Sequence, residues 1–164
     1  MQGSELERLL KTNLDEVLKV ITSRVTLGLP AVKLENSMKA RIRAGRGVAG
    51  NGEQEQLLKS LSREYIKKRS KMALDETTSP STSNLTLTGQ MIASITAQVM
   101  NGKISIGVTG ASNQNKALWA ESKGRPFIYI SAVESEALIL DIEEAISKAL
   151  RRKFGSAAAI RSAS

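Results

Sequence analysis

Two short segments of alternating apolar and polar residues, separated by an Asn–Gly pair, constrain the fold more than any other part of this sequence. Residues 95–100 read Ile-Thr-Ala-Gln-Val-Met, and Ile104, Ile106 and Val108 continue the alternation after Asn101 and Gly102. Successive side chains of a β-strand point to opposite faces, so this period gives each segment one apolar face. Asn and Gly readily adopt the positive φ angles of a two-residue turn. Residues 95–108 are therefore predicted to form an antiparallel β-hairpin.

The N-terminal part of the chain has the period of an amphipathic helix. Ser4 and Glu7 have the spacing of a capping box, in which each side chain satisfies a backbone N–H of the first turn. Apolar residues then recur every three or four positions, at Leu6, Leu10, Leu14, Val17, Ile21 and Val25. We predict one helix that ends near Gly28 and Pro30 and packs this stripe into the core.

The C-terminal part is predicted to hold a short strand and then a long helix. The strand is expected over 127–130, after Pro126, and Ser131 and Glu134 form a second capping box. The helix that follows has one apolar stripe, formed by Leu138, Ile142, Ala145, Ile146, Ala149 and Leu150. Basic residues at 148–153 suit the negative end of the helix dipole. Residues 155–164 are expected to form a flexible tail.

The region between the N-terminal helix and the hairpin is rich in basic residues and glycine. Residues 39–52 are predicted to form a basic, glycine-rich loop, followed by a helix that Asn51 or Gln54 caps. The polar stretch 77–84 is interpreted as a connection, because its flanks are too small for separate cores. The whole order predicts an α+β fold, with a small antiparallel sheet containing the hairpin packed against long N- and C-terminal helices. Residues 1–154 are expected to form a single domain.

The residue types that are missing exclude much chemistry. The chain has neither His nor Cys, so histidine-dependent nucleophiles, disulfides and most zinc sites have no side chains to use. The carboxylates show no calcium-loop or two-metal spacing, and no cofactor or metal is expected. Residues 45–50 match the letters of a dinucleotide-binding glycine motif, but the surrounding strand–helix units of that motif are missing. We predict that the protein is not an enzyme, and rank a nucleotide-dependent enzyme last among the alternatives.

Most of the net charge of +8 comes from one tract. Residues 33–71 contain eleven basic and four acidic side chains, among them Lys39, Arg41, Arg43 and Arg46. Clustered cations bind phosphate backbones by releasing counterions. A small basic nucleic-acid-binding protein is therefore the main alternative function, although no recognition module is present. No stretch has the roughly 20 apolar residues of a membrane helix, and the N-terminus lacks a signal-peptide pattern, so a soluble intracellular product without a membrane partner is expected.

Several short motifs resemble those of one protein family. Residues 87–95, Leu-Thr-Gly-Gln-Met-Ile-Ala-Ser-Ile, are similar to the "L-x-x-T-G-x-L-x-x-S-I" signature of tailed-phage head–tail joining and tail-completion proteins. Residues 117–121 and 124–127 resemble that family's small-aromatic-acidic stretch and its "R-P-F" strand. Residues 61–68 are similar to virion-morphogenesis proteins of Mu-like phages, which usually carry a tryptophan just before the Leu-Ser pair, where this chain has Leu57 and Leu58. The resemblance covers roughly residues 57–150.

The resemblance implies a structural virion protein of the phage neck, located at the head–tail junction and assembled in the host cytoplasm. It would be a tail terminator or tail-completion subunit, forming a ring that caps the tail tube and joins it to the head connector. Expected partners are copies of itself in a ring, commonly a hexamer, the tail tube protein and a head connector or stopper protein. In such a ring, Lys39, Arg41, Arg43 and Arg46 would line the lumen or contact a partner, with nonspecific contact to genomic DNA.

The motif residues are expected to have structural roles. Thr88 is predicted to cap a short helix, Gly89 to pass a tight corner, and Ile92 and Ile95 to face the core. Arg125 is expected to pair with a carboxylate, Pro126 to start the strand, and Phe127 to fill the core. Trp119 is interpreted as a packing residue. The structural motif thus comprises Thr88, Gly89, Ser94, Ile95, Arg125, Pro126 and Phe127.

Overall fold

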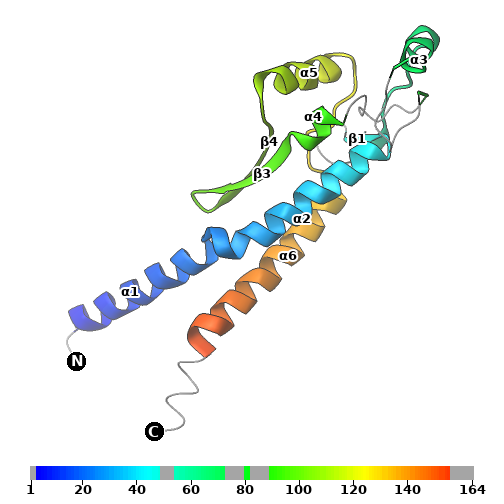
Figure 1. The fold of residues 1–164 in the computed structure, drawn as a ribbon. Helices are drawn as coiled ribbons and strands as arrows, with labels where there is room; N and C mark the ends of the chain where they lie inside the picture. The colour runs from blue at the N-terminus through cyan, green and yellow to red at the C-terminus, as the bar shows by residue number, and fades with distance from the viewer. Residues whose placement is uncertain (1–2, 49–53, 73–79, 82–88, 156–164) are drawn as a thin grey trace. The chain divides into compact units, whose positions relative to one another are not determined.

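The computed structural model of the chain shows an α+β protein (Figure 1), as predicted. It describes residues 3–48, 54–72, 80–81 and 89–155, with the backbone alone for 3–10. The described residues fall into two compact units. Unit 1 comprises Met1–Ala31, Gln98–Ser105 and Leu138–Ser164, and unit 2 comprises Val32–Ala97 and Ile106–Ala137. A single domain over 1–154 stays a prediction.

The N-terminal helical region consists of two helices, α1 (Gly3–Ile21) and α2 (Arg24–Arg43). The prediction of one helix that ends near Gly28 and Pro30 is therefore wrong, because the break occurs at Thr22 and Ser23 and Pro30 lies inside α2. Hydroxyl groups satisfy the backbone at the break. Thr22 Oγ1 donates to the carbonyl of Leu18 (2.6 Å), and Ser23 Oγ accepts from the amide of Thr26 (3.1 Å).

The predicted hairpin is confirmed. Strand β3 (Ile95–Met100) and strand β4 (Lys103–Val108) are joined by Asn101 and Gly102, with φ angles of 50° and 73°. A β-carbon on Gly102 would also lie 2.8 Å from Cβ of Thr22. Both the turn and this close approach therefore require glycine at position 102.

A second antiparallel strand pair begins inside the predicted glycine-rich loop. Strand β1 (Arg46–Val48) pairs with β2 (Glu55–Leu57), with Gly47 opposite Gln56. The loop prediction for 39–52 is wrong for 39–48, because 39–43 form the end of α2 and Gly45, with φ of 76°, turns the chain directly into β1. Residues 49–52 lie outside the described part. Helix α3 (Arg63–Arg69) begins after an N-cap at Ser62, later than the predicted cap at Asn51 or Gln54.

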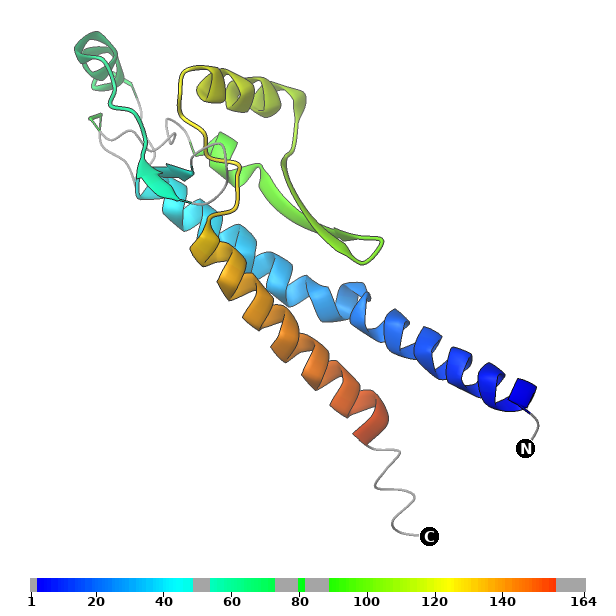
Figure 2. The same ribbon diagram turned by 180° about the vertical axis from the view of Figure 1, so that it is seen from behind.

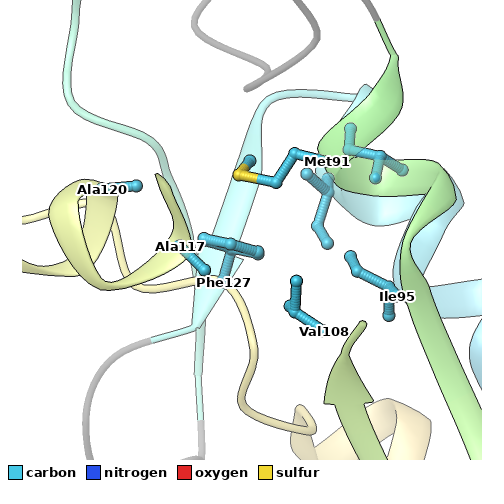
Figure 3. Packing of buried hydrophobic residues seen from close by; sticks show 8 residues of the cluster. Met91, Ile95, Val108, Ala117, Ala120 and Phe127 are labelled. Atoms are coloured by element: carbon cyan, nitrogen blue, oxygen red, sulfur yellow. The ribbon is translucent and has the colours of Figure 1, made fainter. Parts of the chain in front are cut away.

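One hydrophobic cluster forms the core of unit 2. It joins α2, the short helix α4 (Gln90–Ala93), the start of β3, the end of β4, helix α5 (Ala111–Ser122) and Phe127 (Figure 3). Gly89 precedes α4 with φ of 71°, which confirms the predicted corner, and Ile92 and Ile95 are buried as predicted. The cluster comprises Ile42, Met91, Ile92, Ile95, Val108, Ala117, Ala120 and Phe127.

The C-terminal helix begins at the predicted capping box. Helix α6 (Ala132–Leu150) continues into a π-helical turn, η1 (Arg151–Gly155), and Figure 2 shows it from the opposite side. The amide of Ser131 donates to Oε2 of Glu134 (2.9 Å), and the amide of Glu134 donates to Oγ of Ser131 (3.2 Å). The tail predicted for 155–164 lies outside the described residues from 156 onward.

Unit 1 buries only part of the predicted N-terminal stripe. Val17 and Ile21 of the stripe are half-buried, but Leu14 is 59% exposed and Val25 is 87% exposed, so core packing is wrong for these two residues. Leu27 and Ala31, which lie outside the predicted stripe, are buried. The side chains of Leu6 and Leu10 lie outside the described part. An apolar groove in this unit is lined by residues of α1, α2, the hairpin turn and α6, including Ile21, Leu27, Ile104, Leu138, Ile142 and Ile146.

Candidate functional site

The four basic residues predicted to contact a lumen or partner have different environments in unit 2. Lys39 forms an ion pair with Glu35, one helical turn away, at 2.6 Å. Arg41 is buried, whereas Arg43 and Arg46 are exposed on α2 and β1. The prediction that all four lie in a loop is wrong, because Lys39, Arg41 and Arg43 lie on α2 and Arg46 lies on β1. A surface position is also wrong for Arg41, because its partners lie inside the unit. Contact of the other three with a partner stays a prediction.

Arg41 joins the end of α2 to the start of α6 and to the segment before it. Its Nε donates to Oε1 of Glu134 at 2.8 Å, and both side chains are less than 5% exposed. Its Nη2 donates to the carbonyls of Phe127 (3.2 Å) and Tyr129 (2.9 Å). A buried guanidinium requires such compensation, because an unpaired charge in the interior is costly.

These bonds also explain why the strand predicted over 127–130 is wrong. The segment has no strand assignment. Its carbonyl groups bond to the guanidinium of Arg41, and the carbonyl of Pro126 accepts from the amide of Val48 at 3.1 Å. The carbonyls of Phe127 and Tyr129 thus accept from a side chain, and the neighbouring Pro126 carbonyl accepts from β1. These bonds hold the segment in place without a β-ladder.

A second carboxylate extends the network to the small sheet. Oε2 of Glu55 on β2 lies 3.5 Å from Nη1 of Arg46, and its Oε1 accepts from Oγ of Ser131 at 3.1 Å. Ser131 is in turn bonded to Glu134, the partner of Arg41. Alternating charges therefore connect α2, β1, β2 and the N-terminus of α6. This network of hydrogen bonds and ion pairs holds these four elements together.

Glu35 links α2 to the first part of the hairpin. Its Oε2 accepts from the amide of Ala97 at 2.8 Å, while its Oε1 accepts from Lys39. Burial raises the pKa of Glu35, but the hydrogen bonds from Lys39 and Ala97 and the charge of Lys39 outweigh it, so the pKa lies below its usual value of 4.5. The carboxyl group of Glu35 is therefore charged at neutral pH and holds the backbone of Ala97 in place beside α2.

The remaining motif residues lie around the core of unit 2. Phe127 is buried as predicted, and Ser94 Oγ donates to the carbonyl of Met91 at 2.7 Å. Thr88 lies outside the described residues. Arg125 does not pair with a carboxylate of the described residues as predicted; it donates to the backbone carbonyls of Lys59 (3.2 Å) and Ser60 (3.3 Å).

A groove with aromatic and basic residues lies in unit 2 between the segment before α3 and the end of α5. Tyr65 and Trp119 contribute its aromatic side chains, and Lys59, Lys123 and Arg125 contribute its cations. Its volume is about 360 Å³. The interpretation of Trp119 as a packing residue is wrong, because α5 buries Ala117 and Ala120 and leaves Trp119 56% exposed.

The spacing of the small residues on α5 is the sequence signal that could have identified this groove. Ala117 and Ala120 are three positions apart, so they share one face of the helix, and Trp119 falls on another. Near the groove, the hydroxyl of Tyr129 donates to Oε1 of Glu121 at 2.7 Å. This hydrogen bond and the negative charge of Glu121 raise the pKa of Tyr129.

The described residues contain no group of three or more carboxylates that could hold a metal ion. Within the same part of the chain, no helix is both long and apolar enough to cross a membrane. No family model, curated protein or solved structure matches the chain.

Proposed function

We propose that this protein is a structural subunit of the head–tail junction of a tailed phage, a tail terminator or tail-completion protein that acts through protein–protein contacts. The proposal starts from the sequence resemblance. In support of it, residues of three of the four resembling segments contribute to one core: Ile95, Ala117 and Phe127 belong to the same hydrophobic cluster (Figure 3). A set of motifs that builds one core is expected of a shared fold rather than of chance matches.

The observation that carries the assembly role is the exposed apolar face of the N-terminal helices. Leu14 and Leu18 on α1 are one helical turn apart, as are Val25 and Leu29 on α2, and all four are classed as exposed, with Val25 at 87% and Leu29 at 63%. Single exposed apolar residues are common, but repeated ones at helical spacing indicate an interaction surface.

The energetics also favour a partner on this face. Fully burying a Val or Leu side chain contributes about 1.5–3 kcal/mol relative to full exposure. Four partly exposed side chains therefore offer several kcal/mol, enough to contribute to an interface but not to form one without further contacts. A ring supplies such contacts repeatedly, because each subunit uses the same two surfaces.

The solution mass of the purified protein tests the proposal. Light scattering across physiological and high salt, with negative-stain imaging, is expected to show rings heavier than the 17.7 kDa monomer, alone or after tail tubes are added. Val25→Glu with Leu29→Glu should abolish the rings, and Asn36→Glu, at an exposed polar position of α2, should leave them intact. A protein that stays monomeric with tubes and connectors would refute the assembly role. A monomer that instead binds DNA in a salt-dependent way would favour the nucleic-acid alternative.

A further inference from the structure

We propose that the groove between the segment before α3 and the end of α5 binds an acidic segment of a partner protein, anchored by an apolar side chain against Trp119 and Tyr65. The proposal is independent of the assembly role, because it uses none of the exposed apolar residues of α1 and α2. It concerns unit 2 alone.

The aromatic side chains of the groove are exposed but held on ordered helices. Trp119 is 56% exposed on α5, whose opposite residues Ala117 and Ala120 are buried in the core. Tyr65 lies in the first turn of α3, where its amide donates to Oγ of the N-cap Ser62 at 3.2 Å. Exposed Trp and Tyr side chains on rigid elements are the usual anchors of protein interfaces, because they bury a large area and lose little entropy on binding.

One cation of the groove is already positioned. Arg125 uses Nε and Nη2 to hold the carbonyls of Lys59 and Ser60, and its own amide donates to the carbonyl of Ala120 at 3.0 Å. The guanidinium has five N–H donors, so the two bonds leave others that can donate to an anion. A preorganised guanidinium loses less entropy when it binds a carboxylate.

The charge around the groove favours an acidic partner. Residues 54–72 and 111–125, which contain the groove, carry nine basic and three acidic side chains. Lys59, Lys123 and Arg125 line the groove itself, and no carboxylate of the described residues does. Such an imbalance gives a positive potential that attracts anionic groups and excludes basic segments.

The character of the lining favours a protein segment over nucleic acid. Apolar atoms form most of the surface of the groove, although three of its lining residues are cations. Protein interfaces likewise combine a largely apolar contact surface with polar and charged groups. Contacts to nucleic acid are instead made largely to phosphate and sugar, over an extended polar surface. A cavity of about 360 Å³ is the size of a pocket for one or two side chains rather than of a channel for a nucleic-acid strand.

Trp119 is the only tryptophan of the chain, so its fluorescence reports this groove directly. The experiment selects binders from a displayed library of random peptides on the full-length protein, with prior depletion on Trp119→Ala. We expect the selected peptides to combine acidic residues with an aromatic or large aliphatic one. A synthetic copy should change Trp119 fluorescence on binding, and its affinity should fall as salt is raised.

Matched variants separate the groove from the rest of α5. Trp119→Ala and Lys123→Ala, titrated by the anisotropy of a fluorescently labelled peptide because Trp119→Ala has no tryptophan, should each weaken binding by about tenfold, a typical loss for an interface anchor. Leu118→Ala and Lys116→Ala, exposed neighbours on α5 that do not line the groove, should not change the affinity. Lys123→Ala tests a cation of the groove that has no structural bonds like those of Arg125 to Lys59 and Ser60 among those described above.

Three outcomes would overturn the proposal. The first is enrichment of no acidic sequence, and the second is an equal loss of affinity in the Leu118→Ala and Lys116→Ala controls. The third comes from an oligothymidylate probe in the same fluorescence titration. If it binds through Trp119 while the library yields no peptide, the groove serves single-stranded nucleic acid instead.

Discussion

Replacing Arg41 with methionine should destabilise the protein strongly. Methionine keeps the helix propensity and much of the apolar length of the side chain but removes the guanidinium. The change breaks the 2.8 Å bond to Glu134, which is itself 3% exposed, and the bonds to the carbonyls of Phe127 and Tyr129. Removing one partner of a buried ion pair costs about 3–5 kcal/mol, because the remaining charge stays buried without compensation. We therefore expect Arg41→Met to lower the free energy of unfolding by about that amount.

Urea unfolding followed by circular dichroism measures this loss. For a chain of 164 residues, 1 kcal/mol shifts Tm by about 2–4 °C, so thermal unfolding should show a decrease of roughly 6–20 °C. Arg43→Met is the matched control, since Arg43 lies two residues further along α2 and is exposed. Its effect should stay within about 0.5 kcal/mol. Equal stability of the two variants would refute the structural role assigned to Arg41.

A double variant separates two costs of Arg41→Met: the unpaired charge of Glu134 and the lost hydrogen bonds to the backbone carbonyls. Glu134→Gln keeps an acceptor for the amide of Ser131 but removes the negative charge. In Arg41→Met with Glu134→Gln, neither charge of this buried pair remains, so stability should recover partly relative to Arg41→Met alone. A double variant no more stable than Arg41→Met would mean that the unpaired carbonyls of the 127–129 segment dominate the cost.

Three further substitutions test single positions by the same unfolding assay. Gly47→Ala should cost about 1–3 kcal/mol, because the new β-carbon would lie 2.1 Å from the carbonyl oxygen of Pro126; an unchanged stability would show that β1 does not pack this closely. Gly28→Ala should instead stabilise α2 by about 0.5–1 kcal/mol, since it has open space around it, and a loss there would contradict this helix assignment. Glu35→Gln should cost about 1–2 kcal/mol at neutral pH. The pKa of Glu35 is lowered in the folded protein, so the contribution of its charge to stability is present above the usual pKa of 4.5 and is lost as pH falls through the folded pKa. The difference in unfolding free energy between wild type and variant should therefore disappear in acid. A difference that is constant with pH would contradict the assigned ionisation.

The sequence predicted those structural elements whose determining residues are close together in the chain. The hairpin was predictable because Asn101 and Gly102 specify the turn and the flanking period specifies the faces. The capping box of α6 was predictable because both partners, Ser131 and Glu134, lie within one turn. The positive φ of Gly89 follows from the same kind of local requirement.

The pairing of buried charges that are far apart in the sequence could not be predicted. Arg41 and Glu134 are 93 positions apart, so nothing near Arg41 in the sequence indicates that it is buried. A basic residue is normally exposed unless it is paired, and the pair exists only once α2 and the start of α6 meet in unit 2. The strand predicted over 127–130 was wrong for the same reason, since the partner of its carbonyls is the side chain of Arg41.

Short strands and helix breaks were missed because they carry weak patterns. Strands β1 and β2 have three residues each, too few to show a period of two, and glycine beside them suggested a loop. The break at Thr22 and Ser23 contains no glycine or proline, whereas Gly28 and Pro30, the usual breakers, lie inside α2. In both cases the structure depends on hydrogen bonds of backbone groups, between β1 and β2 and at the helix break, that the pattern of side chains does not reveal.

The distribution of charge in the structure changes where an anionic partner is expected. In the sequence, the basic tract at 33–71 reads as one surface, but Lys39, Arg41 and Arg46 each pair with a carboxylate of unit 2. The neighbouring carboxylates partly neutralise these positive charges, so the three residues contribute little to the electrostatic potential at the protein surface. Residues 54–72, most of which belong to the same tract, and residues 111–125 carry nine basic and three acidic side chains, and Lys59, Lys123 and Arg125 among them line the groove at Trp119. An anionic partner should therefore bind at α3 and α5 rather than at the end of α2, whether the protein works in a phage neck or elsewhere.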